Sequence, residues 1–528
     1  MALAALAAAA PFAEAKPERE SVMWQKIRET PASLEVIGTL KCPQSAEIAD
    51  SNWSIGCECL NLGYGNFVRF ADPVWVDMTT GRVCEIPASS FHAEEGGTRF
   101  VALSIHDAPV MVAERAVVPV VAGRAKFSIT DFGARPENAT DALAAAIDAC
   151  AKRGGGCVTV PTGTWRTGPI HLQSNVELHL AENAVLSFSD CHEDYLPAVE
   201  VSWEGVECIN FSPLVYAYGC TNIAITGKGT FAPRIEGWEP WFKREAPPQR
   251  EAVRILYRWS IGRTPLGERH LWRLDAHSRP HLIHLNRCRG VRLEDFRIRE
   301  SPFWCVHLYR SRDVVVRRLD ISAMRQNNDG IDVEMSRDVL IEDCTFNQGD
   351  DAIVLKAGRN REAREKGEPT ENVTVRNCRA EKALTLATVG SEVSAGVRHV
   401  RISDCTVKNV GKLVHLKTNE RRGGEIADIV CERIRAEGAS VAVVVIQADA
   451  LYDEWKRIVP EDIAISDLHD ITVRDITCGR AGALGIIKGD ARRPFGRISA
   501  IGVRADNLIG SKWSVTNAPC VAIEPLRL

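Results

Sequence analysis

Short β-type runs recur through the second half of the chain, and this recurrence most constrains the fold. The runs begin at Val291, Val314, Val339, Val373, Val400 and Ile426. Most of the intervals between these starts are roughly 23 to 27 residues, with one longer, which is the range expected for one turn of a solenoid. Such a turn is too short for a strand–helix–strand unit, and the intervening residues lack a helical period. Stacked parallel strands satisfy the pattern because each turn buries its apolar side only against its neighbours. The sequence predicts a parallel β-helix over residues 122–528.

The start of this unit has the features of a cap. Thr140 or Asp141 can cap a helix over Ala142–Lys152, with Ala145, Ile147 and Cys150 available for burial. A helix placed before the first full turn would close the open end of the strand stack.

The N-terminal quarter of the chain has a different texture. Short β-type runs alternate with turn signals over residues 31–121, which predicts a small antiparallel, β-sandwich-like domain. Before it, Met1–Phe12 is apolar and Ala13–Ala15 has the small-x-small form of a signal-peptidase site. We therefore expect residues 1–30 to be an export signal and linker, and the protein to be periplasmic or secreted.

Composition excludes several classes of protein. The net charge is −4 over 528 residues, without the basic excess typical of a nucleic-acid-binding protein. No apolar run approaches the roughly 20 residues that a membrane-spanning helix needs. We expect neither nucleic acid nor a membrane as a partner.

Cysteine and arginine usage leave two further expectations. Cys288, Cys344, Cys378 and Cys405 recur in similar contexts, which predicts buried thiols at a repeated packing position. The segment 243–318 carries 18 basic and 8 acidic residues. These arginines either form a basic wall beside a groove for an anionic polymer or cover the outer surface of the solenoid.

The most informative stretch runs from Asn327 to Lys356. An Asn-x-Asp-Gly motif containing Asp329 is followed by a Gly-Asp-Asp motif containing Asp350 and Asp351. The interval between Asp329 and Asp350 is close to one solenoid turn, so the carboxylates should lie on neighbouring turns. Crowded carboxylates repel one another, so at least one should hold a proton near neutral pH. One protonated and one ionised carboxyl is the pair that glycosidic cleavage needs.

These motifs resemble those of glycoside hydrolase family 28, the polygalacturonases, over residues 127–452. The resemblance also rests on Asp131–Ala134, Gly154–Pro161, Ser174–Leu180, Arg279-Pro280, Ser301–Trp304, Gly390–Glu392, Lys417-Thr418 and Arg422–Gly424. The Gly-Ser-Glu form and the insertions are most similar to bacterial exo-acting members.

The resemblance implies a right-handed parallel β-helix and an inverting hydrolase that acts on an α-linked galacturonide or related pectic oligosaccharide. By motif, Asp350 would be the general acid, and Asp329 and Asp351 would activate water. The resemblance likewise implies that Asn327, His415, Lys417 and Tyr452 bind substrate. It implies no metal and no organic cofactor.

Two positions depart from the family pattern. The family has Gly-His-Gly shortly before its Gly-Ser, whereas this chain reads Leu384–Gly390 without histidine. The family's Arg-Ile-Lys is replaced by His415–Lys417, and imidazole is not equivalent to the bidentate guanidinium that pairs with a sugar carboxylate. We therefore expect weak activity on unmodified polygalacturonan compared with a modified pectic substrate.

Two other classes of function remain open. A polysaccharide lyase on the same fold would act on uronides by β-elimination, with the aspartates holding Ca²⁺. A non-catalytic carbohydrate-binding protein would explain the missing histidine. The acid–base trio favours the hydrolase, because a binding protein has no need of mutually repelling carboxylates.

Overall fold

The computed structural model describes residues 125–242, 247–274, 276–450 and 462–524, together with the backbone of eight strands between residues 22 and 114. The chain divides into two compact units, Met1–Val121 and Ala122–Leu528. The expected signal sequence before residue 22 lies outside the described residues. So does most of the expected sandwich-like domain.

The described strands of the first unit form four antiparallel pairs. These pairs are β1–β2 (Val22–Glu29, Leu34–Cys42), β3–β4 (Leu60–Asn61, Phe67–Val68), β5–β6 (Val74–Val76, Val83–Glu85) and β7–β8 (Arg99–Ile105, Ala108–Glu114). Strand β1 lies within the segment that we expected to be a linker.

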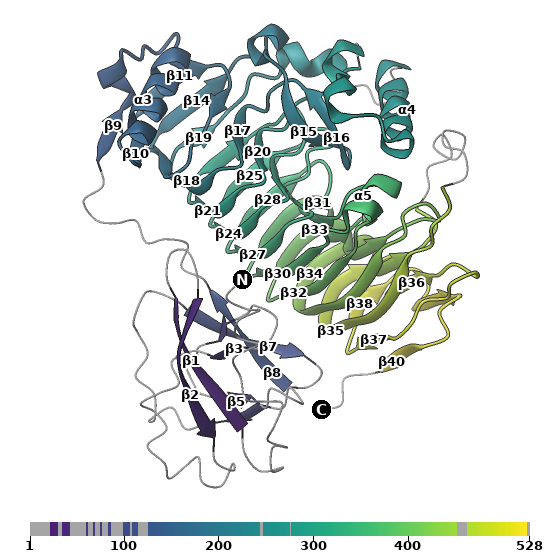
Figure 1. Cartoon of the computed structure of the whole chain (residues 1–528). Coiled ribbons are helices and arrows are strands. Elements are labelled where there is room, and N and C mark those ends of the chain that lie inside the picture. The colour runs from purple at the N-terminus through teal and green to yellow at the C-terminus, as the bar shows by residue number, and fades with distance from the viewer. Residues whose placement is uncertain are drawn as a thin grey trace. The chain divides into compact units, whose positions relative to one another are not determined.

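The second unit is a coil of parallel strands, so the predicted parallel β-helix is confirmed (Figure 1). Each turn contributes strands to three sheets. The first sheet contains β9 (Lys126–Ser128), β10 (Gly156–Val160), β13 (Val176–Leu180), β18 (Thr221–Gly227), β21 (Arg289–Glu294), β24 (Arg312–Arg317), β27 (Arg337–Glu342), β30 (Thr370–Arg376), β32 (Val397–Ser403), β37 (Ile498–Ile501) and β40 (Val521–Glu524).

The second and third sheets follow the same order along the coil. The second contains β11 (Gly163–Thr167), β14 (Ala184–Phe188), β19 (Thr230–Phe231), β22 (Arg297–Arg299), β25 (Asp320–Ala323), β28 (Thr345–Gln348) and β38 (Arg504–Leu508). The third contains β12 (Ile170–His171), β17 (Val215–Tyr218), β20 (Ile283–Asn286), β23 (Val306–Tyr309), β26 (Ile331–Glu334), β29 (Ile353–Lys356), β36 (Gly485–Lys488) and β39 (Trp513–Thr516).

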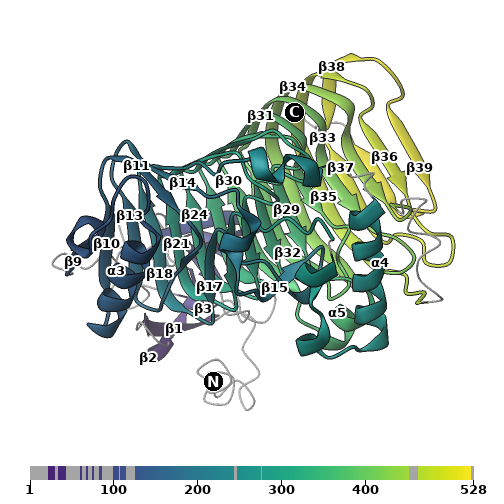
Figure 2. The same cartoon turned by 90° about the horizontal axis from the view of Figure 1, so that it is seen from above.

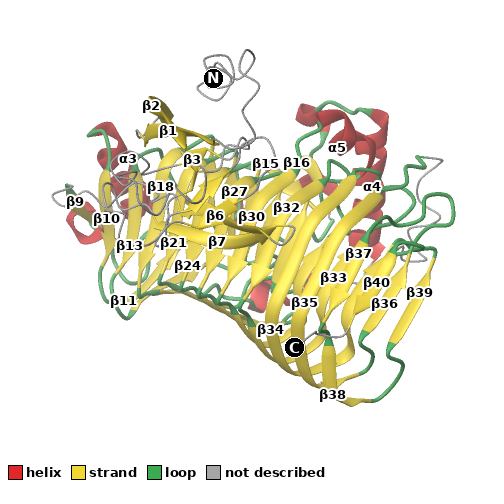
Figure 3. Cartoon of the chain, turned by 90° about the horizontal axis from the view of Figure 1, so that it is seen from below, coloured by secondary structure: helices red, strands yellow, loops and turns green. Residues whose placement is uncertain are grey.

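Toward the C-terminus the strands lengthen and run from one sheet into the next (Figure 3). These long strands are β31 (Arg379–Val389), β33 (Thr406–Lys417), β34 (Glu425–Gln447) and β35 (Asp467–Ala481). Strand β34 pairs along its length with β32 of the first sheet, with the long strand β33 and with β36 of the third sheet.

The predicted repeat corresponds to one column of the first sheet. Val291, Val314, Val339, Val373 and Val400 are successive register partners. The next partner of Val400 is Ile429, because the predicted start at Ile426 lies beside Val397. Their side chains belong to a continuous apolar core that extends from Ile129 to Ala518.

The predicted cap is present as α3 (Thr140–Lys152), at one end of the coil (Figure 2). Its Ile147 and Cys150 are buried in the core as expected, but Ala145 is exposed and Ala146 is buried instead. Ala139 is the N-cap residue, and Asn138 Oδ1 accepts a hydrogen bond from the Thr140 backbone N–H at 3.0 Å.

Two insertions contain helices beside the coil. The insertion at 231–284 forms α4 (Pro247–Gly262), and short 3₁₀ turns occur at η4 (Ile129–Phe132), η5 (His192–Tyr195), η6 (Glu236–Phe242), η7 (Leu266–Glu268) and η8 (Leu271–Leu274). Residues 359–369 form the second and shorter insertion, which is rich in charged residues. That segment forms α5 (Asn360–Lys366), because Ala363 packs against Tyr309 and Met335.

The four repeated cysteines, Cys288, Cys344, Cys378 and Cys405, are buried free thiols, as predicted. The arginines of 243–318 favour the second expectation for this segment. Arg289 pairs with Asp313, Arg317 with Glu294 and Arg318 with Asp295, so these side chains cover the outer surface of the coil in ion pairs.

Candidate functional site

In its middle strands, β20, β23, β26 and β29, the third sheet buries both of its faces. In β26, Ile331 and Val333 belong to the core, whereas Asp332 and Glu334 alternate with them and point outward. The outward residues of neighbouring strands are also polar, among them His284, Asn286, His307, Tyr309 and Lys356. All of them are buried.

A β-hairpin covers this polar face. Strands β15 (Val199–Trp203) and β16 (Val206–Asn210) pair with each other and not with the coil. A separate apolar cluster joins Trp203 of the hairpin to Leu256 of α4 and to Trp304, which lies just before β23. The outward polar side chains therefore lie in an interior between the coil and these added elements.

The candidate carboxylates lie just before two strands of this sheet. Asp329 precedes β26, and Asp350 and Asp351 precede β29. Because β26 and β29 are paired in register, Asp329 lies on the turn next to Asp350 and Asp351, as the spacing predicted. The Gly330 backbone N–H donates to the Asp351 carbonyl at 3.0 Å. A Cβ at position 330 would lie 2.4 Å from the Ala352 carbonyl oxygen, so this close approach requires glycine.

The aspartates have different environments. Asp329 is 5% exposed and Asp351 is 1% exposed, whereas Asp350 is only partly buried. Burial, reinforced by the neighbouring carboxylates of Asp332 and Asp350, raises the pKa of Asp329 well above its usual value. Burial alone would raise the pKa of Asp351 as well, but the ammonium of Lys417, together with the hydroxyl groups of Thr385 and Thr388, outweighs it and lowers that pKa. Lys417 Nζ lies 3.2 Å from Asp351 Oδ2.

A second cation lies among the carboxylates. Lys356 Nζ is 3.2 Å from Glu392 Oε2, 3.6 Å from Asp332 Oδ1 and 3.9 Å from Asp329 Oδ2. The same ammonium lies 4.2 Å from the centre of the Trp304 ring. Burial alone would raise the pKa of Glu392, but Lys356 and Arg359 hold it well below its usual value.

Sequence reasoning assigned no role to Lys356, Arg359 or Glu392. Lys356 and Glu392 lie within the stretch Asn327 to Lys356 and the motif Gly390–Glu392, so the sequence did point to both residues. The missing information was their contact between segments that are far apart along the chain.

Basic side chains also line the other side of the trio, on β33. Half-buried Lys412 lies within electrostatic range of Asp350 and Asp351. His415 is 6% exposed, and burial, with help from Lys417 and Lys412, lowers its pKa to about 3. The imidazole is therefore neutral at physiological pH.

Of the two remaining candidate substrate-binding residues, the structure describes Asn327 but not Tyr452. Asn327 Oδ1 accepts a hydrogen bond from Arg279 Nη2 at 2.9 Å, and Arg279 is fully buried. The Arg279 guanidinium also donates to the Pro302 carbonyl at 2.8 Å. Arg279 thus holds the turn before Asp329 in place. Tyr452 lies outside the described residues.

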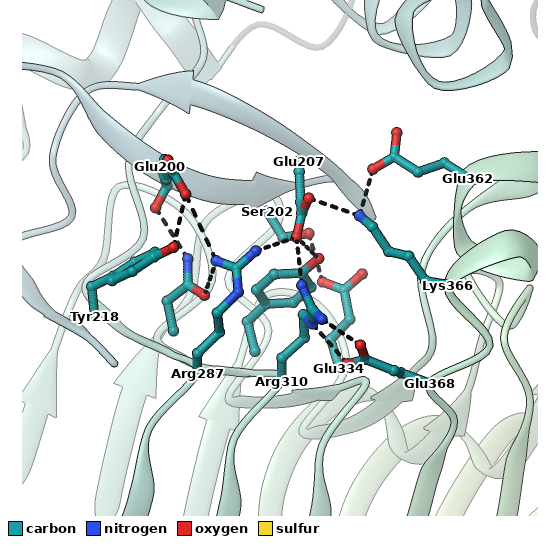
Figure 4. Close-up of polar contacts among 12 residues, drawn as sticks. Glu200, Ser202, Glu207, Tyr218, Arg287, Arg310, Glu334, Glu362, Lys366 and Glu368 are labelled. Atoms are coloured by element: carbon teal, nitrogen blue, oxygen red, sulfur yellow. Dashed lines mark hydrogen bonds and ion pairs between the residues drawn. The ribbon is translucent and has the colours of Figure 1, made fainter. Parts of the chain in front are cut away.

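A charged network fastens the hairpin to the coil (Figure 4). Glu207 accepts hydrogen bonds from Tyr309 and Arg287, each at 2.8 Å, and pairs with Lys366 of α5 at 2.8 Å. Burial alone would raise the pKa of Glu207, but Lys366, with Tyr309 and Arg287, lowers it to about 2. Ser202 donates from the hairpin to Glu334 Oε2 at 2.9 Å.

Comparison with known proteins agrees with this geometry. Residues 268–520 match the family described as glycosyl hydrolases family 28. The structure is similar to that of a hyperthermoactive exopolygalacturonase from Thermotoga maritima, with 33% identity and a TM-score of 0.67, covering 76% of this chain and 92% of that one. The chain belongs to glycosyl hydrolase family 28.

Two more distant relatives align over a smaller share of both chains. A probable polygalacturonase from Vitis vinifera is 28% identical over 57% of this chain and 59% of its own. An exo-poly-alpha-D-galacturonosidase from Dickeya chrysanthemi is 24% identical over 66% of this chain and 62% of its own. The chain thus spans about three-fifths of the length of these two curated relatives.

The departures of this family 28 chain are visible in the site. Leu384, at the start of the stretch where the resemblance implies a histidine, is 47% exposed, and its backbone N–H donates to the Asp350 carbonyl at 2.8 Å. The candidate acid is therefore bonded through its backbone to a residue with an apolar side chain. No helix in the described part of the chain is long and apolar enough to cross a membrane.

Proposed function

We propose that this family 28 protein is an inverting glycoside hydrolase that removes units from the end of an α-linked galacturonide or related pectic oligosaccharide. The observation that carries the proposal is the electrostatic asymmetry of the trio. Asp351 is held ionised by Lys417, whereas the Asp329 carboxyl beside it favours its protonated form. A site with both an ionised and a protonated carboxyl can activate water and assist a leaving oxygen.

Within this proposal, Asp351 deprotonates the attacking water, which Asp329 helps to orient, and Asp350 gives the proton that it shares with Asp329 to the glycosidic oxygen. Asp350 is the least buried of the three, which favours contact with the leaving group. Asp329 and Asp350 interact through their charges, so one proton held between them satisfies both. Asn327 acts through Arg279 as a positioning residue.

An anionic substrate agrees with the two lysines of β33. Lys412 and Lys417 place positive charge beside the carboxylates, where a sugar carboxylate would be attracted. Neutral His415 adds a hydrogen-bonding group but no charge. We therefore expect weaker action on unmodified polygalacturonan than on a modified pectic substrate, with Tyr452 as a further substrate contact.

Exo action is supported by the elements beside the sheet. The hairpin β15–β16 and helix α4 cover the polar face next to the aspartates, and this cover favours binding of a chain end. The names of the Thermotoga and Dickeya relatives describe exo-acting enzymes. The apolar N-terminal segment supports a periplasmic or secreted location.

Incubation with a panel of pectic oligosaccharides tests the reaction class. Mass spectrometry and NMR should detect single sugar units with inverted anomeric configuration. A conjugated unsaturated product with strong ultraviolet absorbance would establish a lyase instead. A complete lack of products across the panel would favour a non-catalytic binding protein.

The variant Asp350→Asn tests the assignment of the acid. It keeps the shape and removes the proton, so rates on natural oligosaccharides should fall about 10²-fold or more. Activated aryl glycosides need little acid assistance and should lose much less. Asp351→Asn should slow both substrate types, because water activation does not depend on the leaving group. If Asp329→Asn gives the leaving-group dependence and Asp350→Asn does not, the acid is Asp329.

A further inference from the structure

Three histidines meet on the outward face of the third sheet, beneath the hairpin. His281 precedes β20, His284 lies within β20, and His307 lies within β23, where it is the register partner of His284. The side chains are fully buried. The proposed hydrolytic reaction gives none of them a role.

The three rings have the spacing of ligands around one ion. Their centres are 5.0 Å apart for His281 and His284, and 4.7 Å apart for each of the two pairs that include His307. The potential ligating nitrogens all lie within 4.8 Å of one another. With metal–nitrogen bonds of about 2.0–2.1 Å, an ion lies roughly 3.2 Å from each ring centre, so rings around a tetrahedral ion have centres roughly 5 Å apart.

One ring is already oriented toward the centre of the cluster. His307 Nε2 contacts Glu334 Oε2 at 2.9 Å, and Ser202 holds the same carboxylate oxygen. If Nε2 donates to Glu334, Nδ1 carries the lone pair, and it faces His284 Nδ1 at 2.9 Å. A carboxylate behind the distal nitrogen of a histidine is the usual arrangement around metal-ligating imidazole.

Another ring lacks any hydrogen-bond partner. Both ring nitrogens of His281 are buried without one, and so is Nε2 of His284. The surroundings of His281 are aromatic, with Phe303 and Trp304 at ring distances of 5.2 and 5.3 Å. Buried polar atoms normally have a partner, and a bound ion would supply one to His281.

We propose that His281, His284 and His307 bind a single divalent transition-metal ion of the zinc type. An all-imidazole set suits zinc and its neighbours in the transition series and not Ca²⁺ or Mg²⁺, which prefer oxygen ligands. Burial lowers the pKa of all three histidines, which keeps them in the neutral form that coordinates metals. The sequence-based expectation was that no metal is needed.

The charges around the cluster can accept a cation. Lys356 acts electrostatically on His281 and His307, but Glu392, Asp332 and Asp329 already compensate its charge. Arg287 acts on His284 and is paired with Glu207. Glu334 adds a carboxyl directly behind His307. When the ion binds, the proton between His284 and His307 moves to His284 Nε2, which no other group occupies. The ion then links β20 to β23 beneath the hairpin, and its role is structural.

The test uses the untagged full-length protein, stripped of metal by a chelator and titrated with Co²⁺. Tetrahedral Co²⁺ bound through nitrogen absorbs in the visible range, so binding is observed without any assay of activity. We expect one Co²⁺ per chain, its displacement by Zn²⁺, and a rise of several degrees in melting temperature with either ion. Absence of stoichiometric binding to the wild-type protein would overturn the proposal.

The variant His281→Phe removes a ligand while filling the same aromatic space. It should bind Co²⁺ at least 100-fold more weakly than the wild type. Its melting temperature without metal should equal or exceed that of the metal-free wild type, because it removes two unsatisfied nitrogens. His284→Asn, which keeps a donor beside His307, should lose binding in the same way and provides a second variant if the first fails to fold.

The matched control is His399→Gln, which removes a partly exposed histidine that is bonded to Asp428 on the first sheet. It should bind Co²⁺ like the wild type. Equal affinity of wild type, His281→Phe and His284→Asn would place the bound ion elsewhere and refute the site.

Discussion

Lys417 and Asp351 form the ion pair on which the proposed protonation pattern of the site depends. The ammonium lies 3.2 Å from a carboxylate that is 1% exposed, so solvent screens their attraction little. Together with the hydroxyl groups of Thr385 and Thr388, it keeps the pKa of Asp351 below its ordinary value of 3.8 despite burial. Asp351, the proposed base, is therefore ionised at pH values at which the Asp329 carboxyl is still protonated.

Removal of this cation should change the pH dependence of catalysis. In Lys417→Met the pKa of Asp351 rises, so protonation inactivates the base at higher pH. The acidic limb of the kcat/KM profile should move upward by about 1 to 3 pH units. Lys408→Met is the control, since Lys408 is an exposed lysine of the same strand, and its profile should match the wild type. An unshifted limb in Lys417→Met would show that Asp351 is not the base.

At this scale the sequence predicted which residues meet but not how burial divides their roles. Repulsion among carboxylates predicted one retained proton, and the raised pKa falls on Asp329. Asp332, to which sequence reasoning assigned no role, contributes to that shift. Its influence depends on full burial beneath the hairpin, which spacing along the chain cannot reveal.

At the scale of elements, the hairpin β15–β16 depends on one buried carboxylate. Glu207 brings together Arg287 and Tyr309 from the coil and Lys366 from α5. In Glu207→Gln the shape is kept and the charge is lost, which leaves Arg287, Arg310 and Lys366 without their shared partner. We expect a loss of about 3 kcal/mol in the free energy of unfolding, as for a broken buried ion pair, measured by denaturant titration.

The pH dependence of that loss has a defined sign. The pKa of Glu207 is lowered to about 2 in the folded protein from an ordinary value of 4.5. Its stabilising effect is therefore complete above pH 4.5 and disappears as pH falls toward 2, where wild type and variant should converge. Glu200→Gln, on the same hairpin, is the control. Its carboxylate is 43% exposed, so we expect a change within about 0.5 kcal/mol. Equal losses in the two variants would contradict the assignment to Glu207.

The two helices of the insertions differ in how far sequence could have revealed them. Helix α4 buries Val253, Leu256 and Ser260 at helical spacing, a signal that was present but not used. Helix α5 is short and charged, and Ala363 is its one buried apolar residue. Only the contact of Ala363 with Tyr309 and Met335 explains its position, and that contact comes from distant parts of the chain.

At the scale of the whole molecule, the apolar core that the described side chains form lies within the second unit. The apolar cluster from Ile129 to Ala518 is continuous, with α3 covering its first turn. A chain comprising residues 122–528 should therefore fold alone. Circular dichroism should show mainly β-structure, and the cooperative melting transition should lie within a few degrees of the corresponding transition in the full chain. A molten or aggregated product would show that the first unit is required for folding.

The coil itself was the most predictable feature. Apolar runs that begin at Val291, Val314, Val339, Val373 and Val400 carry the period directly, because each must face the core of its own turn. The merging of sheets in β31, β33 and β34 was not predictable from that period. It requires that the corner between two sheets is itself extended, so that one continuous strand belongs to both sheets, as in β31, β33 and β34.

The register of the first sheet has a consequence for how such a protein can change over evolutionary time. Val291 and Val314 are paired partners joined by one short turn, whereas Val339 and Val373 are paired across a longer stretch that contains α5. Extra chain is therefore accommodated at the corners and leaves the rungs undisturbed. A lineage can exchange whole corner segments, and with them the walls around the substrate, while the spacing of Asp329 and Asp351 stays fixed by hydrogen bonds between adjacent strands. Substrate range and bond-breaking chemistry can thus evolve as separate modules of one chain.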